Sequence, residues 1–142
     1  MLNFDDLIEK DGLYFEINSD VAFNGEVTGN VVGSFINGKP EGELIQYYKN
    51  GEVLSKGTYK NGELEGEFLY YYDNGQLKEK RNYKNGKLEG EFFYYYKNGQ
   101  LWIKNNYKNG ILEGERLVYF ENGKLEKTET YKNGLNSSKS FH

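Results

Sequence analysis

The stretch YKNGKLEGEFFYYYKNGQLWIKNN, residues 83–106, decides the fold, because it is one of four similar units that follow one another without a gap. Asn-Gly occurs ten times in the chain, and from Asn37 onward the intervals alternate between 13 and 11 residues. The units, with a period of 24, begin at Phe35, Tyr59, Tyr83 and Tyr107. Self-similarity at this period is typical of an array in which each unit packs on its neighbours.

Each unit is predicted to form one β-hairpin, because Asn-Gly between β-rich runs favours a tight turn. The expected strands are 67–72, 76–83, 91–96, 100–107, 115–120 and 124–131, joined alternately by a tight xNG turn and a longer KNGxLEG connection. The predicted fold is all-β: an elongated, single-layer, antiparallel β-meander of 24-residue hairpin repeats. Residues 1–34 are expected to form an N-terminal cap with a shortened repeat, aligned as 24–38 on 61–75. Residues 35–130 hold the four repeats, and residues 131–142 a partial repeat and tail.

The register of the xNG turn predicts which side chains share a face. A three-residue loop closed by a Gly bulge places Tyr71 opposite Leu77 and Tyr95 opposite Leu101. This register gathers the positions that stay apolar in every unit into one structural stripe. The stripe comprises Ile45, Leu69, Phe93, Leu117, Tyr47, Tyr71, Tyr95, Tyr119, Val53, Leu77, Leu101, Leu125, Tyr59, Tyr83, Tyr107 and Tyr131.

A second set of aromatic side chains is predicted on the opposite face, beside Lys78, Lys80 and Lys104. We interpret this set as a candidate partner-binding site, and cross-strand packing of Tyr rings with Lys stems is the alternative that stays open. Trp102 stands out, because other units have Leu54, Lys78 or Glu126 at its position, and it is expected opposite Tyr94. The candidate site comprises Phe68, Tyr70, Tyr72, Phe92, Tyr94, Tyr96 and Trp102.

Composition excludes several classes of function. The net charge of −4 disfavours nucleic acid and anionic lipid, since both attract an excess of Lys and Arg. The chain has no Cys, which removes disulfides and thiolate chemistry. The acidic N-terminus lacks the pattern of a signal peptide, so a cytoplasmic location is predicted, although a signal removed before Met1 would leave the same pattern.

The recurring acids offer no catalytic or metal site in this interpretation. Glu41, Glu65, Glu89 and Glu113, each followed two residues on by another Glu, are copied beside Lys in every unit, and we interpret them as solvated loop charges. His142 is the only His. The sequence therefore predicts no enzyme, no catalytic residue, no metal and no cofactor.

The motif YKNGxLEGExxxYYxNGxL resembles the MORN repeat (membrane occupation and recognition nexus), in its bacterial variant that is often described as the antitoxin of a toxin–antitoxin pair. The resemblance covers residues 35–134 and implies an array of β-hairpins. MORN repeats also flank the catalytic domain of some lipid kinases. This chain has no Gly-rich phosphate loop and no Lys–Asp–Asp set, so a phosphatidylinositol phosphate kinase activity is not expected.

The function predicted from the sequence is a non-enzymatic scaffold that binds a protein partner, with a cognate toxin as one such partner. Binding of membrane lipid or of carbohydrate is the alternative, and an end-to-end homodimer through the terminal strands stays open.

Overall fold

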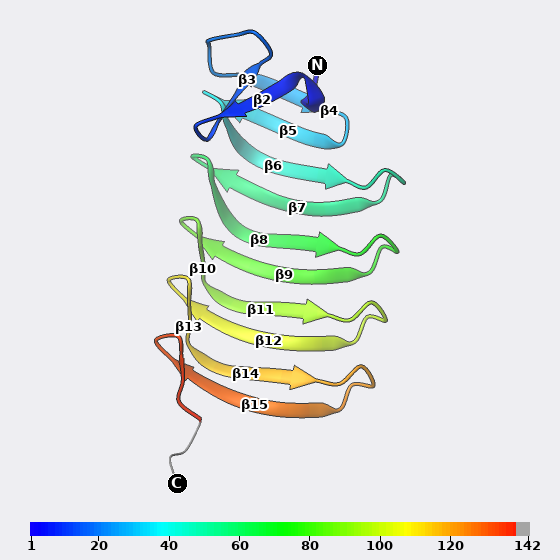
Figure 1. Ribbon diagram of the computed structural model, residues 1–142, viewed down its shortest axis with the longest axis vertical. Helices are drawn as coiled ribbons and strands as arrows, with labels where there is room; N and C mark the ends of the chain where they lie inside the picture. Colours follow the sequence, from blue (N-terminus) through cyan, green and yellow to red (C-terminus); the bar gives the residue numbers. More distant parts are fainter. Residues whose placement is uncertain (139–142) are drawn as a thin grey trace.

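The computed structural model describes residues 1–138 and is all-β apart from one turn of 3₁₀ helix, η1 (Phe4–Asp6). Figure 1 shows the strands stacked one below another from the N-terminus to the C-terminus, as the sequence predicts. The main sheet has 14 strands, antiparallel except for β1 on β4. The strands are β1 (Leu2–Asn3), β2 (Leu7–Lys10), β3 (Leu13–Glu16), β4 (Gly25–Thr28), β5 (Val31–Ile36), β6 (Lys39–Tyr47), β7 (Val53–Lys60), β8 (Glu63–Tyr71), β9 (Leu77–Lys84), β10 (Lys87–Leu88), β11 (Gly90–Tyr95), β12 (Leu101–Lys108), β13 (Ile111–Leu112), β14 (Gly114–Tyr119), β15 (Leu125–Lys132) and β16 (Leu135–Asn136).

Of the two kinds of Asn-Gly turn, one is shorter than expected and the other has the expected length. In the KNGxLEG connection, Lys60 pairs directly with Glu63, and both Asn61 and Gly62 have positive φ, at 53° and 79°. This is a two-residue turn with the backbone of type I′, so the prediction of a longer connection is wrong. The xNG turn is the three-residue loop that the sequence predicts, because Tyr71 pairs with Leu77 and Gly75 has a φ of 87°.

A further β-bulge follows every xNG turn, and it changes which residues share a face. Tyr71 pairs with Leu77 but Tyr70 pairs with Glu79, so Lys78 is an extra residue on β9. On the second strand of each hairpin, the side chains that follow the bulge therefore point to the face opposite the predicted one. The aromatic face, as we call it, carries Phe68, Tyr70, Phe92 and Tyr94 together with Tyr83 and Tyr107. The lysine face carries Leu69, Lys80, Phe93 and Lys104.

The bulge overturns the predicted structural stripe. Beyond Phe35, which is also buried, the buried apolar side chains of the array are Phe68, Phe92 and Val118, and these lie on the aromatic face. None of the predicted stripe residues is buried, and Leu125 is 52 % exposed. Lys80 and Lys104 were predicted beside the aromatic set, but they lie on the lysine face. The tightly packed face of the sheet is therefore the one that the sequence assigns to partner binding.

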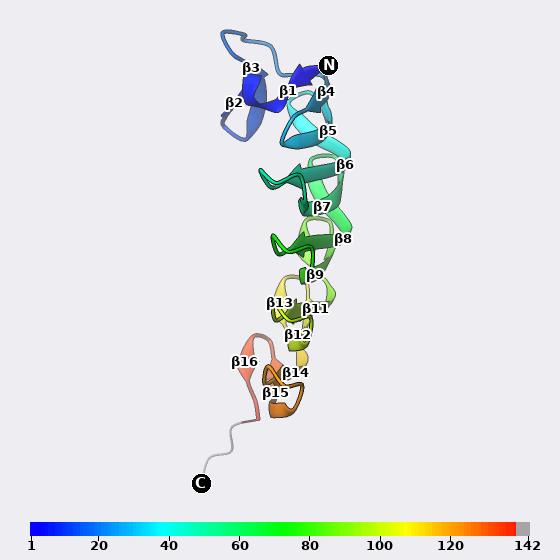
Figure 2. The same ribbon diagram turned by 90° about the vertical axis from the view of Figure 1, so that its right-hand side faces the viewer.

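The N-terminal region has the one hydrophobic cluster of buried residues within residues 1–138, formed by Leu7, Phe23, Val27, Val31 and Phe35. The β2–β3 hairpin forms a small second sheet, and Figure 2 shows it beside the column of main strands. Its Tyr14 backbone N–H donates to the Gly38 carbonyl at 2.8 Å. This hairpin covers the first level of the aromatic face, because the Tyr14 ring packs on Phe35, and Phe35 occupies the position of Tyr59 in the next unit.

The shortened repeat aligns differently from the prediction. Asn24 does not adopt the positive φ of Asn61, and its side chain accepts a hydrogen bond from the Asn37 backbone N–H at 2.9 Å. Glu41 makes the same contact with the Asn61 N–H at 2.8 Å. Asn24 therefore corresponds to Glu41 of the regular unit and not to a turn Asn.

At the other end, β16 pairs with β15 through Tyr131 and Lys132. Residues 139–142, which include the end of the predicted partial repeat and His142, lie outside the described residues.

Candidate binding site

The seven predicted site residues differ in how much of each side chain is exposed to solvent. Phe68 and Phe92 are buried, with exposed fractions of 9 % and 3 %, so they pack the array and offer no surface to a partner. Trp102 is 39 % exposed, the largest exposure in the set. The four Tyr side chains, Tyr70, Tyr72, Tyr94 and Tyr96, are half-buried.

Trp102 is the extra residue of the bulge on β12. Tyr94 pairs with Ile103 and Tyr95 pairs with Leu101, so the predicted pairing of Trp102 with Tyr94 is wrong in register. The indole nevertheless reaches the expected neighbours. Its ring stacks on Tyr96 with centroids 5.1 Å apart, and it meets Tyr94 edge-on at 6.3 Å. A bulge directs a side chain away from the regular ladder, which explains its exposure.

The rings behind Trp102 continue into the packed part of the face. Tyr94 stacks on Phe92 at 4.6 Å between centroids, and Phe92 packs on Tyr107 at 5.8 Å. Burial, and after it the negative charge of Glu79, raises the pKa of Tyr94. Its phenol therefore stays protonated as a hydrogen-bond donor or acceptor up to high pH.

Arg81 is a charged residue on the aromatic face that the sequence did not indicate as part of the site. Its guanidinium lies between two rings, 5.1 Å from the Tyr70 centroid and 5.0 Å from the Phe92 centroid. It donates to Glu79 Oε2 at 2.7 Å and to the Tyr83 hydroxyl at 2.9 Å. Burial alone would lower the pKa of Arg81, but the hydrogen bonds to Tyr83 and Glu79 raise it overall. Glu79 is itself buried, so this ion pair is internal and its two charges compensate each other.

Tyr72 and Tyr96 connect successive units and are only partly available to a partner. The Tyr72 hydroxyl donates to the Tyr95 carbonyl and the Tyr96 hydroxyl to the Tyr119 carbonyl, each at 2.7 Å. Tyr48 makes the same bond to Tyr71 at 2.6 Å. The recurrence of Tyr48, Tyr72 and Tyr96 at the repeat period was the signal that could have revealed this ladder.

The recurring acids have a defined structural role. Glu65 Oε2 accepts from the Asn85 backbone N–H at 2.9 Å, and Glu41, Glu89 and Glu113 repeat the contact on Asn61, Asn109 and Asn133 at 2.8 Å. Each acid thus holds the type I′ turn of the following unit. This is a more specific role than that of a solvated loop charge, which the sequence predicts. No cluster of three or more potential metal ligands occurs within residues 1–138.

The lysine face is covered by ion pairs. Lys104 bonds Glu91 at 2.9 Å and lies 6.0 Å from the Phe93 centroid, and Lys80 pairs with Glu67 at 3.3 Å. These ion pairs are partly exposed to solvent and contribute little to stability. No helix in the described part of the chain is long and apolar enough to cross a membrane.

Comparison with known proteins agrees with this geometry. A search of curated proteins finds no significant match. The family model for the MORN repeat variant matches four consecutive segments, residues 40–61, 64–85, 88–109 and 112–133. Each segment runs from one type I′ turn to the next and contains one complete xNG hairpin. Because these matches cover more than half of the chain, the protein belongs to the MORN repeat variant family and is an all-β repeat scaffold.

Proposed function

We propose that this scaffold binds a protein partner through the exposed part of the aromatic face, centred on Trp102. The observation that carries the proposal is the exposure of Trp102 at a position where the equivalent residues are Leu54, Lys78 and Glu126. Units that serve only to fold need no Trp here, since Lys78 lies over the Tyr72 ring at 5.6 Å in the same place.

The chemistry of the site favours a protein surface. Trp and Tyr bury a large area at a low entropic cost and are enriched among interface residues that dominate affinity. Tyr96 and Tyr94 brace two sides of the indole, so its orientation is fixed before a partner arrives. The net charge of −4 gives no general attraction to anionic lipid. The resemblance to antitoxin-type repeats makes a cognate toxin the first protein to test.

The experiment compares the wild-type chain with Trp102→Lys. This substitution copies the residue of the second unit, Lys78, and therefore preserves the fold more surely than removal of the half-buried Tyr94. Glu126→Ala, at the same position of the fourth unit, is the control. Both variants are immobilised beside the wild type, exposed to lysate from the source cell, and checked by circular dichroism.

We expect a protein that is retained by the wild type and by Glu126→Ala but lost with Trp102→Lys. With that protein purified, the loss should reach about 2 kcal/mol or more, a fall in affinity of roughly thirtyfold. Equal retention by all three chains would remove Trp102 from the interface. Binding to vesicles or to a glycan array that depends on Trp102 would replace the protein partner by lipid or carbohydrate.

A further inference from the structure

A cleft lies where the β2–β3 hairpin overhangs the first level of the aromatic face. Residues alternate along β2, so Leu7 and Glu9 point to the same side of the hairpin, and Glu9 pairs with Tyr14 on β3. Leu7 on this side is buried in the N-terminal core, and the Tyr14 ring packs on Phe35. The hairpin therefore presents a carboxylate on the side that faces the sheet.

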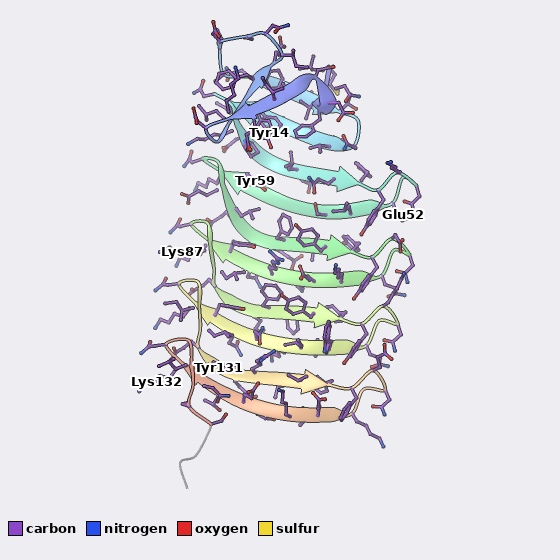
Figure 3. The ribbon with its side chains drawn as sticks, in the orientation of Figure 1. Tyr14, Glu52, Tyr59, Lys87, Tyr131 and Lys132 are labelled. Atoms are coloured by element: carbon purple, nitrogen blue, oxygen red, sulfur yellow. The ribbon has the colours of Figure 1, made fainter. Side chains whose placement is uncertain are left out.

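The cleft has a volume of about 300 Å³, at the lower end of the range for small-molecule sites. Its walls combine polar backbone and side-chain groups with the side chains of Phe4, Tyr14, Phe35 and Leu44. Tyr59 and Gln46 line it from the main sheet. Figure 3 shows Tyr14 on the hairpin above Tyr59 on the next level of the array.

Glu9 is the one charged residue that lines this cleft. Among the described residues no Lys, Arg or His lies within ion-pair distance of its carboxylate, whereas Glu67, Glu79, Glu91 and Glu129 all have basic partners. Burial, followed by the charge of Glu9, raises the pKa of Tyr14, so the phenol beside the carboxylate stays neutral. The cleft thus combines aromatic walls with one uncompensated negative charge.

We propose that the cleft between β2–β3 and the main sheet binds an organic cation, an ammonium or guanidinium group carried on an apolar body. The cation would meet the Glu9 carboxylate and the faces of the surrounding rings, which attract positive charge. The apolar body would lie on Leu44 and Tyr59, which are half-buried and line the cleft, where it removes hydrocarbon surface from water. The group can come from a free amine or from a Lys or Arg side chain of a polypeptide. The site is separate from Trp102 and does not depend on the proposed partner interface.

The test uses two probes of the same shape and opposite charge, phenethylammonium and 3-phenylpropionate. Amide signals of the whole ¹⁵N-labelled protein are followed by NMR during titration with each probe. We expect shifts at Tyr14, Leu44 and Tyr59 with the ammonium only. Glu9→Gln should weaken its binding roughly tenfold, the scale of a lost hydrogen bond to a charged group.

Glu16→Gln is the matched control, because Glu16 lies on the same side of the same hairpin but outside the cleft.

A lysine blocked at both ends is titrated in parallel. If it binds more tightly than phenethylammonium, the cation belongs to a polypeptide, and if it binds more weakly, the cation is a free amine. The proposal is overturned if the anion binds as well as the cation, if Glu9→Gln binds like the wild type, or if no probe shifts these signals at millimolar concentration.

Discussion

The hydroxyl of Tyr72 donates a hydrogen bond to the backbone carbonyl of Tyr95, 2.7 Å away and 23 residues further along the chain. Tyr48 and Tyr96 repeat this bond in the units before and after. The fourth unit has Phe120 at this position, with no hydroxyl to donate. Each bond joins two consecutive units at the xNG edge of the sheet, so the aromatic composition of the chain serves the contact between repeats as well as any surface.

Replacing Tyr72 by Phe should lower the free energy of unfolding by about 1 kcal/mol, because a half-buried hydrogen bond is lost while the ring remains. Tyr95→Phe is the control, since the Tyr95 hydroxyl has no hydrogen-bond partner among the described residues and its carbonyl is unchanged. Urea denaturation measures both. Equal stabilities for the two variants would show that the hydroxyl bond contributes nothing between units.

The Glu89 carboxylate, which accepts from the Asn109 N–H at 2.8 Å, should protect that amide from exchange with solvent. In Glu89→Ala we expect faster hydrogen exchange at Asn109 and a loss of about 1 kcal/mol, because the turn loses a charge-assisted acceptor in an exposed position. Glu91→Ala, which removes an ion pair with Lys104 instead, should leave the exchange at Asn109 unchanged. Unaltered exchange in Glu89→Ala would mean that the turn holds its shape without the acid.

The two faces of the sheet should differ in their sensitivity to truncation. Phe92→Ala removes a ring that is 3 % exposed and should cost roughly 3 to 5 kcal/mol. Tyr95→Ala, on the lysine face, should cost clearly less, because its ring is only half-buried and stacks on Phe93 alone, at 6.3 Å. Thermal melts decide the order. A larger loss for Tyr95→Ala would restore the stripe that the sequence predicts.

The reversal of the two faces shows how far the sequence could predict this fold. The 24-residue period, the hairpins and the pairing of Tyr71 with Leu77 follow from Asn-Gly spacing and alternation, since turn chemistry is local. The bulges at Lys78 and Trp102 carry no such signature, because the extra residue can be of any type and differs in every unit. One unmarked residue inverts the alternation for the rest of a strand. The aromatic set therefore contained both the packed Phe92 and the exposed Trp102, which only the structure separates.

Stability should fall as pH rises through the range where Tyr titrates. Burial raises the pKa values of Tyr14, Tyr59 and Tyr94 above 10.0, so the folded chain keeps these protons at a pH where the unfolded chain has released them. The folded state then binds more protons, and the free energy of unfolding decreases with increasing pH. The pKa of Lys104, raised by its hydrogen bond to Glu91 and then by the charge of Glu91, has the same sign.

This stabilisation is complete below about pH 10 and is lost above it. Urea denaturation at about pH 9 and about pH 11 should show the decrease, and the double variant Tyr59→Phe, Tyr94→Phe should show a smaller one. A free energy of unfolding that is the same at both values of pH would contradict the expectation that burial holds these protons.

Deleting a whole unit should leave a folded array, because neighbouring units contact each other in equivalent ways, but two deletions of equal length should not be equally stable. Removing residues 59–82 brings Phe92 next to Gly57, which already accommodates a Phe ring, since Phe68 lies where a Cβ on Gly57 would stand. Removing residues 83–106 instead brings Arg116 next to Arg81 and takes away Phe92, one of the two rings that flank the Arg81 guanidinium. Like charges in adjacent, partly buried positions repel, and Arg81 loses its cation–π contact with Phe92 while it keeps the one with Tyr70. Both variants should give β-type circular dichroism, with the lower melting temperature for the deletion of residues 83–106.

Arg116→Phe in the variant that lacks residues 83–106 should recover part of the difference in melting temperature by restoring the ring beside Arg81. Equal melting temperatures, or no recovery, would show that the order of units along the aromatic face has no bearing on stability.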